Sequence, residues 1–208
     1  DQVLSPEQRE GAVILQANDF QTSFIRNDGH GKFSIMPLPV QAQFSVINGM
    51  VAGDFDGDGN LDLVMNGNDY GTEVSTGRYD AFNGLFLKGD GKGNFSPESI
   101  LQSGIFIPGN GKALAELRDA NGHAMVVAGQ NRGPLRIFEA KRDLKTVSTL
   151  PADVAALLRL RNGKSRRQEF YYGSSFLSQS TRVLDIDGNI LSAEIIDEKG
   201  KRRSVALP

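Results

Sequence analysis

The chain has neither cysteine nor tryptophan among its 208 residues. Without cysteine, disulfide bonds and thiolate chemistry are excluded, and the compartment must be inferred from other features. No apolar run approaches the roughly 18 residues of a membrane span, so no transmembrane helix is expected. The formal net charge of −2 favours neither nucleic acid nor an anionic membrane surface as a partner. The first residue, Asp1, is not followed by a signal-peptide pattern, as is also true of a secreted protein after its signal is removed.

Convincing helix patterns are also scarce, whereas glycine is abundant, with 24 residues. Short alternating apolar segments separated by glycine-rich turns are typical of a protein built from many short strands. A hydrophobic content of 39% and this length allow one large or two small domains with a proper core. The sequence therefore predicts an all-β fold.

The segment from residue 54 to 62 reads Asp-Phe-Asp-Gly-Asp-Gly-Asn-Leu-Asp, which has the spacing of a calcium loop. Positions 1, 3, 5 and 9 offer carboxylates, position 7 offers a backbone carbonyl, and glycine at position 6 permits a sharp turn. Oxygen donors alone favour Ca²⁺ over Zn²⁺. The alternative, an empty acidic turn, would hold four mutually repelling charges within nine residues. The predicted ligands are Asp54, Asp56, Asp58, Asn60 and Asp62, with Gly59 at the turn.

The flanks of this segment decide which kind of calcium loop it is. Position 12 is Met65 rather than the bidentate glutamate of an EF-hand. Residues 46–53 are too rich in glycine and β-branched side chains for a helix, and residues 61–65 alternate as a strand does. The loop is therefore predicted to join two β-strands.

Internal repeats extend this pattern along the chain. Val13–Asp19, Leu63–Asp69 and Met125–Asn131 resemble one another, and each is predicted to be a short buried strand. Two further segments, 24–33 and 86–95, read as hairpins with an Asp-Gly tip. A weaker third copy of the hairpin is expected between residues 135 and 149.

A unit of about 50 to 60 residues with four short antiparallel strands is one blade of a β-propeller. The units cover about residues 12–40, 44–97 and 112–149, and the first lacks its first strand. The prediction is a partial β-propeller of about two and a half four-stranded blades. Because a closed ring needs at least four, the missing blades are expected from upstream sequence or another chain.

The third unit is predicted to have lost its metal. When the units are aligned on their second strands, one carboxylate, Glu116, remains, and Arg118 takes position 3. Two interpretations of Arg118 stay open. The guanidinium replaces a bound cation, or it points to solvent.

These motifs carry a family resemblance. The Asp-x-Asp-x-Asp-Gly-Asn-x-Asp loop, paired with the Asp-Gly-x-Gly-x-Phe hairpin, resembles the FG-GAP or VCBS repeats of integrin-type propellers over about residues 12–149. Residues 171–180, with the string Gly-Ser-Ser-Phe-Leu-Ser-Gln-Ser, and residues 193–201 resemble the ASPIC/UnbV module. That module follows such propellers in cartilage acidic protein and in many bacterial surface proteins. The resemblance implies a secreted or cell-surface protein with a binding role.

Residues 151–208 are predicted to form a separate small β domain after propeller blades in residues 1–150. Leu158 and Leu160 alternate with arginines, which favours a strand; a turn is expected at residues 162–163, and two more hairpins are expected at residues 187–189 and 199–200. One hairpin carries four basic residues, interpreted as a solvated face or an anion site. These are Arg161, Lys164, Arg166 and Arg167.

The second unit has a 12-residue insertion between its second and third strands. In an up-and-down blade this loop lies at the end opposite the calcium loop. Its aromatic and charged residues suit a recognition surface; the alternative is that Arg78 and Asp80 pair with each other or with neighbouring blades and only hold the loop in place. The predicted ligand or partner surface consists of Tyr70, Glu73, Arg78, Tyr79 and Asp80.

No enzyme signature is found: the sequence has no phosphate-binding loop, dinucleotide fingerprint or nucleophile elbow. The two histidines, His30 and His123, lie in expected turns without catalytic partners. The sequence predicts a non-catalytic calcium-binding module for protein or glycan interaction outside the cell. The alternatives are a lyase-type polysaccharide enzyme on a calcium-bearing propeller and a structural spacer.

Overall fold

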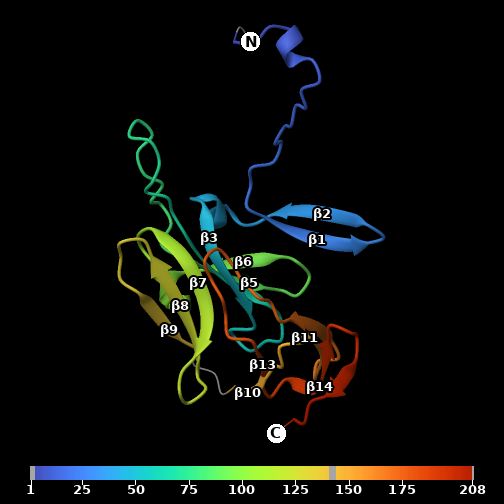
Figure 1. Ribbon diagram of the computed structural model, residues 1–208. Helices are drawn as coiled ribbons and strands as arrows, with labels where there is room; N and C mark the ends of the chain where they lie inside the picture. Colours follow the sequence, from blue (N-terminus) through green and yellow to red (C-terminus); the bar gives the residue numbers. More distant parts are fainter. Residues whose placement is uncertain (1–2, 141–143, 208) are drawn as a thin grey trace.

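The computed structural model describes residues 3–140 and 144–207. This part of the chain consists of small antiparallel sheets joined by turns, so the prediction of an all-β protein is confirmed (Figure 1). Its helices are short, and none of the described ones is long and apolar enough to cross a membrane. They are η1 (Glu7–Arg9), η2 (Val40–Gln43) and α1 (Ile100–Ser103).

A four-stranded sheet lies at the centre of the molecule, with its strands in sequence order. Every residue of β4 is buried, and the hairpin expected from residues 86–95 is present, so the second repeat is confirmed. The bounds are β3 (Ile47–Gly53), β4 (Asp62–Gly67), β5 (Leu85–Gly89) and β6 (Phe95–Glu98).

The next sheet contains β7 (Gly111–Arg118), β8 (Ala124–Gln130) and β9 (Arg136–Glu139). It packs on the central sheet through one apolar cluster that includes Val64 and Leu114. The predicted buried strand near residue 125 is confirmed as β8, whose residues alternate between buried and half-buried.

Asn68, which follows β4, ties the central sheet to the segment before β7. Its side-chain amide donates to the carbonyls of Phe82 (2.6 Å) and Gly109 (2.7 Å), and its Oδ1 accepts from the Phe82 N–H (3.0 Å). Asn68 has a φ of 86°, a conformation that asparagine tolerates better than most residues. This double role explains an asparagine at this point of the repeat.

The prediction of a third hairpin, between residues 135 and 149, is wrong. β10 (Lys145–Ser148) pairs with β13 (Val183–Ile186) and not with β9. Val147 of β10 packs against the C-terminal apolar core, and this packing favours pairing with a strand that is distant in the sequence. Residues 141–143, at the expected hairpin tip, lie outside the described part of the chain.

The C-terminal sheet has the order β12-β11-β14-β15 and packs over a core that includes Leu158 and Ile195. The strand and the turns expected at residues 162–163 and 199–200 are confirmed. Residues 187–189 form a turn but no hairpin, because β13 pairs with β10 and β14 with β11. The bounds are β11 (Asp153–Leu160), β12 (Ser165–Glu169), β14 (Ile190–Asp197) and β15 (Arg202–Ser204).

The first repeat is only partly formed. β1 (Ser23–Gly29) and β2 (Lys32–Pro37) make the expected hairpin. The preceding segment, Val13–Asp19, is extended and projects away from the sheets, so the prediction of a buried strand there is wrong (Figure 1). No strand of the described residues pairs with it, and its apolar side chains stay in contact with solvent.

Candidate metal centre

The acidic loop, residues 54–61, joins β3 to β4 as predicted. Oxygen atoms of Asp54, Asp56 and Asp58 all lie within 4.8 Å of one another. Within the described ranges this is the one group of three or more acidic, histidine or cysteine side chains placed in this way. The structure thus brings together three of the five predicted ligands.

The backbone of the loop is shaped by hydrogen bonds from its own amides. The Asp54 carboxylate accepts from the N–H groups of Gly57 (2.9 Å) and Gly59 (3.1 Å). Asp56 and Asp58 each accept from the N–H two residues later, at 3.0 and 2.8 Å. Gly59 has a φ of 89°, as the predicted sharp turn requires.

Asp62 does not join the cluster. Its buried carboxylate accepts from the N–H groups of Phe55 (3.0 Å) and Gly89 (2.9 Å), which fastens the loop to β5. Burial is the main cause that raises the pKa of Asp62 to about 6, and the charge of Asp56 adds to it. The fifth predicted ligand, Asn60, accepts through its side-chain oxygen from the Lys164 ammonium (3.0 Å).

A lysine ammonium provides the positive charge nearest to two of the three carboxylates. Lys88 on β5 pairs with Asp56 and, at 3.3 Å, with Asp58. Hydrogen bonds to both carboxylates raise the pKa of the Lys88 ammonium. Burial acts to raise the pKa of Asp58, but the Asn60 N–H and Lys88 outweigh it and leave that pKa below its usual range.

The donor set fits a hard divalent cation. Three carboxylates converge, and none of the three side chains offers the sulfur or imidazole nitrogen that zinc prefers. Because Lys88 is drawn to the same oxygens, this place attracts positive charge. Asp54, Asp56 and Asp58 could hold the ion, while Asp62 would support the loop from behind.

The C-terminal sheet also contacts the acidic loop, a contact that was not predicted from the sequence. Arg166 Nη1 lies 3.3 Å from Asp54 Oδ2 and 3.3 Å from the Gly59 carbonyl oxygen. Asn189 donates to the Gly57 carbonyl. Part of the basic hairpin is therefore a docking face and not a solvated one. The opposite charges of the acidic loop and the basic hairpin were the feature of the sequence that could have indicated this contact.

The other two members of the basic hairpin have local partners. Arg161 donates through Nε to the Gly188 carbonyl (2.6 Å), and Arg167 pairs with Glu169. The hairpin therefore does not act as a single basic cluster.

The third repeat differs from its predicted alignment. The turn from β7 to β8, residues 119–123, is three residues shorter than the acidic loop, so Arg118 lies at the end of β7 and not in the turn. Its side chain is only 9% exposed and pairs with Glu116 (3.0 Å) and with Asp185 on β13. Arg118 is therefore a built-in cation, and the solvent-facing alternative is wrong.

The serine-rich string from residue 173 to 180 lies against β3 and β7. Ser178 Oγ and Ser180 Oγ each accept at 3.0 Å from backbone amides of β7, those of Leu114 and Glu116, and Ser175 Oγ accepts from Met50 on β3 (3.4 Å). The hydroxyls thus satisfy backbone donors along the edges of these strands.

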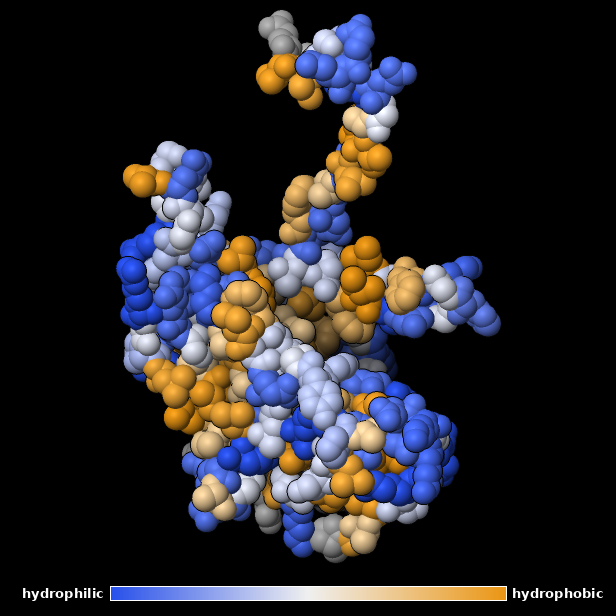
Figure 2. Space-filling view, viewed as in Figure 1, coloured by the Kyte–Doolittle hydropathy of each residue, from blue (hydrophilic) through white to orange (hydrophobic). Residues whose placement is uncertain are grey.

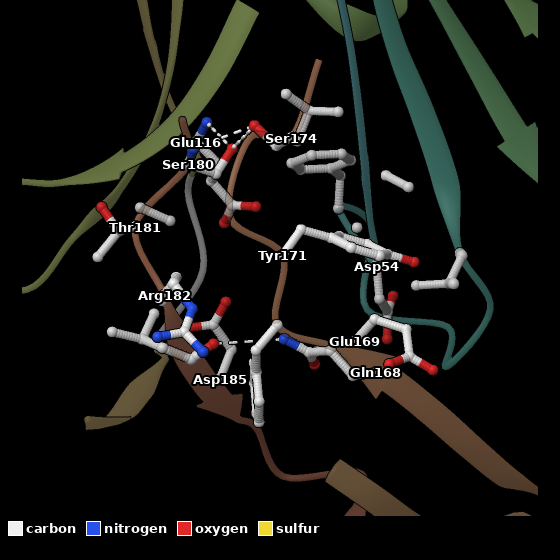
Figure 3. A pocket seen from close by; sticks show the side chains of 18 of the residues that line it. Asp54, Glu116, Gln168, Glu169, Tyr171, Ser174, Ser180, Thr181, Arg182 and Asp185 are labelled. Carbon is white, nitrogen blue, oxygen red and sulfur yellow. Dashed lines mark hydrogen bonds between the residues drawn. The ribbon is translucent and has the colours of Figure 1, made fainter. Parts of the chain in front are cut away.

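A cavity of about 370 Å³ lies between three sheets: the central sheet, the β7–β9 sheet and the C-terminal sheet (Figure 3). Figure 3 shows Ser174 and Ser180 beside Glu116, with Arg182 and Asp185 further along the wall. The wall of the cavity combines acidic and basic side chains with apolar ones such as Phe55 and Phe170.

The insertion after β4 forms a projecting loop at the end of that strand opposite the acidic loop. The Arg78 guanidinium lies 4.7 Å from the centre of the Tyr70 ring and pairs with Asp80 at 3.7 Å. Tyr79 bridges to Asp69 through the backbone, and Glu73 Oε1 accepts from the Thr76 hydroxyl. Both predicted features, an exposed mixed surface and an internal Arg78–Asp80 pair, are present.

No known family model matches this chain, and no curated protein is similar to it. The likeness to FG-GAP/VCBS repeats and to the ASPIC/UnbV module therefore stays a prediction.

Proposed function

We propose that this chain is a non-catalytic, calcium-binding interaction module of the β-propeller type, acting outside the cell or at its surface. The observation that carries the proposal is the convergence of Asp54, Asp56 and Asp58 in the turn between the first two strands of a four-stranded antiparallel sheet. That sheet is the second of the two and a half blades, and upstream sequence or another chain completes the ring.

The metal has a structural role in this proposal. Calcium would offset the repulsion among three carboxylates and fix the loop that Arg166 and Asn189 contact. Since Arg166 binds a loop carbonyl as well as Asp54, the C-terminal sheet would recognise the ordered loop. Calcium then stabilises both the blade turn and the docking of the C-terminal sheet.

Thermal unfolding in calcium and in excess chelator tests the metal. A ligand at about 100 times its dissociation constant adds about 2.7 kcal/mol to the free energy of unfolding, so chelation should lower Tm by several degrees. Asp56→Ala should abolish this calcium-dependent shift. The matched control is Asp119→Ala, which removes the carboxylate of the shorter turn between β7 and β8 and should leave the shift unchanged.

An unchanged Tm on chelation, for the wild type and Asp56→Ala alike, would contradict calcium binding. A shift that Asp119→Ala also abolishes would place the metal elsewhere. Isothermal titration with Ca²⁺ gives the stoichiometry, which should be one.

The partner surface is proposed to lie on the insertion, at the end of β4 away from the metal. The Arg78 guanidinium over the Tyr70 ring places an aromatic and a cationic group side by side, which suits a protein or glycan partner. The triple variant Tyr70→Ala/Arg78→Ala/Tyr79→Ala should keep its Tm within about 2 °C, because these side chains lie on a projecting loop. On a glycan array and against purified surface proteins it should lose the binding that the wild type shows. If the triple variant retained this binding, the Arg78–Asp80 pair would only stabilise the conformation of the loop.

A further inference from the structure

A mainly apolar groove of about 610 Å³ lies between the β1–β2 hairpin, the central sheet and the β11–β12 hairpin. Figure 2 shows it as a hollow of hydrophobic residues below the projecting N-terminal segment. Phe24 of β1 lines it and packs edge-on against Phe95, with 5.7 Å between the ring centres. Other apolar residues that line it are Leu38, Met50, Ala52, Leu61, Leu63 and Leu160.

An apolar segment without a partner strand leads into this hairpin. Val13, Ile14 and Leu15 are 84%, 82% and 89% exposed, although residues of this type are usually buried. β1 pairs with β2 along one edge, and no described strand pairs with its other edge. The groove, the free edge and the segment therefore occur together in one part of the molecule.

The sequence repeat supplies a register for joining them. In the second repeat β4 pairs with β5 through Leu63 opposite Leu87, Val64 opposite Phe86 and Met65 opposite Leu85. The first repeat lacks the 12-residue insertion, but its two segments align with β4 and β5, so the equivalent pairs are Val13 opposite Ile25, Ile14 opposite Phe24 and Leu15 opposite Ser23. The intervening residues, 16–22, are enough for the connection.

The repeat alignment also predicts which side chains of residues 13–15 would lie on each face of the added strand. Val64 and Phe86 point together into the core between the central sheet and the next one. By the same alternation Ile14 would lie beside Phe24 in the groove. Val13 and Leu15 would lie on the opposite face with Ile25, which is itself exposed.

We propose that the segment around Val13–Leu15 docks as a third strand on the free edge of β1, in this register, with Ile14 inserted into the groove. The occupant is this chain's own segment. Docking satisfies backbone donors along an open edge and removes the Ile14 side chain from water. It leaves Val13 and Leu15 as an apolar outer face for the adjoining blade. The inference goes beyond the proposed function and does not depend on the metal.

Because the chain contains no cysteine, engineered disulfides test the docking directly. Val13→Cys/Ile25→Cys places the thiols on neighbouring strands, within the Cα separation of 4.4–6.8 Å that a disulfide tolerates. The matched control is Val13→Cys/Ile35→Cys, because Ile35 pairs with Ile25 on the far side of β1. Two strand spacings, roughly 9.5 Å, are too wide for a disulfide.

The first pair should form an intramolecular disulfide at least tenfold faster than the control pair. A freely moving segment would favour the shorter loop by only about two- to threefold. Adding Ile14→Ser should reduce the preference to that level, whereas adding the outward-facing Leu15→Ser should preserve it. Both side chains are exposed in the projecting conformation, so neither change threatens folding.

A preference of no more than about threefold for the first pair, or a larger preference that survives Ile14→Ser, would overturn the proposal. Disulfide-linked dimers through positions 13 and 25 would also overturn it, because they would show that the segment pairs with a second copy. Non-reducing electrophoresis and mass spectrometry distinguish these outcomes.

Discussion

The β3–β4 turn and the β7–β8 turn join equivalent strands of two neighbouring sheets, but they obtain positive charge in different ways. The longer turn gathers three carboxylates and draws cations from elsewhere, from Lys88 on β5 and Arg166 on β12. The shorter turn is closed by one carboxylate, Asp119, which accepts from the N–H groups of Asn121 and His123 at 2.8 Å. Its cation, Arg118, belongs to the strand itself.

This difference shows two ways to attach the C-terminal part of the chain, one through β13 of the β10–β13 sheet and one through β12 of the C-terminal sheet. Arg118 bridges directly to Asp185 on β13, so the β7 attachment needs no further ion. At the acidic loop, Arg166 pairs with Asp54, and Lys88 pairs with Asp56 and Asp58, so the cations come from different elements. We expect the first attachment to be permanent and the second to respond to calcium.

The largest effect is expected from breaking the built-in attachment. Arg118→Met would leave Glu116 and Asp185 without their buried guanidinium, and losing one member of a buried ion pair costs about 3–5 kcal/mol. Urea unfolding should report a loss of this order, whether or not calcium is present. Arg159→Met, at an exposed position on β11, is the control and should change stability by less than about 0.5 kcal/mol. A loss below 1 kcal/mol in Arg118→Met would show that the bridge is not a main attachment.

A smaller effect is expected where the acidic loop meets the C-terminal sheet. Arg166→Met removes contacts to Asp54 and to the Gly59 carbonyl, both at 3.3 Å, and should cost about 1–2 kcal/mol. The loss should also weaken calcium binding, because the loop loses a contact that orders it. Arg167→Met, at the next position of β12, is the control, since its exposed side chain pairs only with Glu169 among the described ion pairs. If both variants respond equally to calcium, docking and metal binding are independent.

The smallest effect, and the sharpest test of the comparison, concerns Lys88. Its ammonium shares carboxylate oxygens with any bound metal, so Lys88→Met should strengthen calcium binding, by roughly three- to tenfold. Titration calorimetry measures the change. Lys92→Met, in the turn of the same hairpin, changes the net charge equally and should have less effect. Weaker binding in Lys88→Met would mean that the lysine holds the loop in its binding shape.

Short-range features could be read from the sequence. The acidic loop, its glycine turn and the hairpins at residues 90–94 and 162–163 depend on contacts between residues a few positions apart. Alternation of apolar residues identified β11 because one face of that strand packs on a core. The pairing of β10 with β13 could not be found in this way, because the partners are some 40 residues apart and the local pattern fits either strand.

The candidate site also has features that local contacts determine and features that residues distant in sequence determine. The spacing of Asp54, Asp56 and Asp58 was enough to predict that they converge, since each carboxylate binds amides within the loop. The place of Asp62 behind the loop depends on the Gly89 amide, 27 positions away, and was not predictable from spacing.

The all-β character, the strands and turns of the second repeat and the acidic loop were predictable from the amino-acid sequence, because they follow from side-chain alternation and local backbone hydrogen bonds. The cations that meet the loop, the direction of Arg118 and the partner strand of β10 depend on how the sheets pack. It also left Val13–Leu15 exposed, although their composition is that of a buried strand. Burial and charge pairing depend on segments far apart in the chain, and these come together only when the sheets pack.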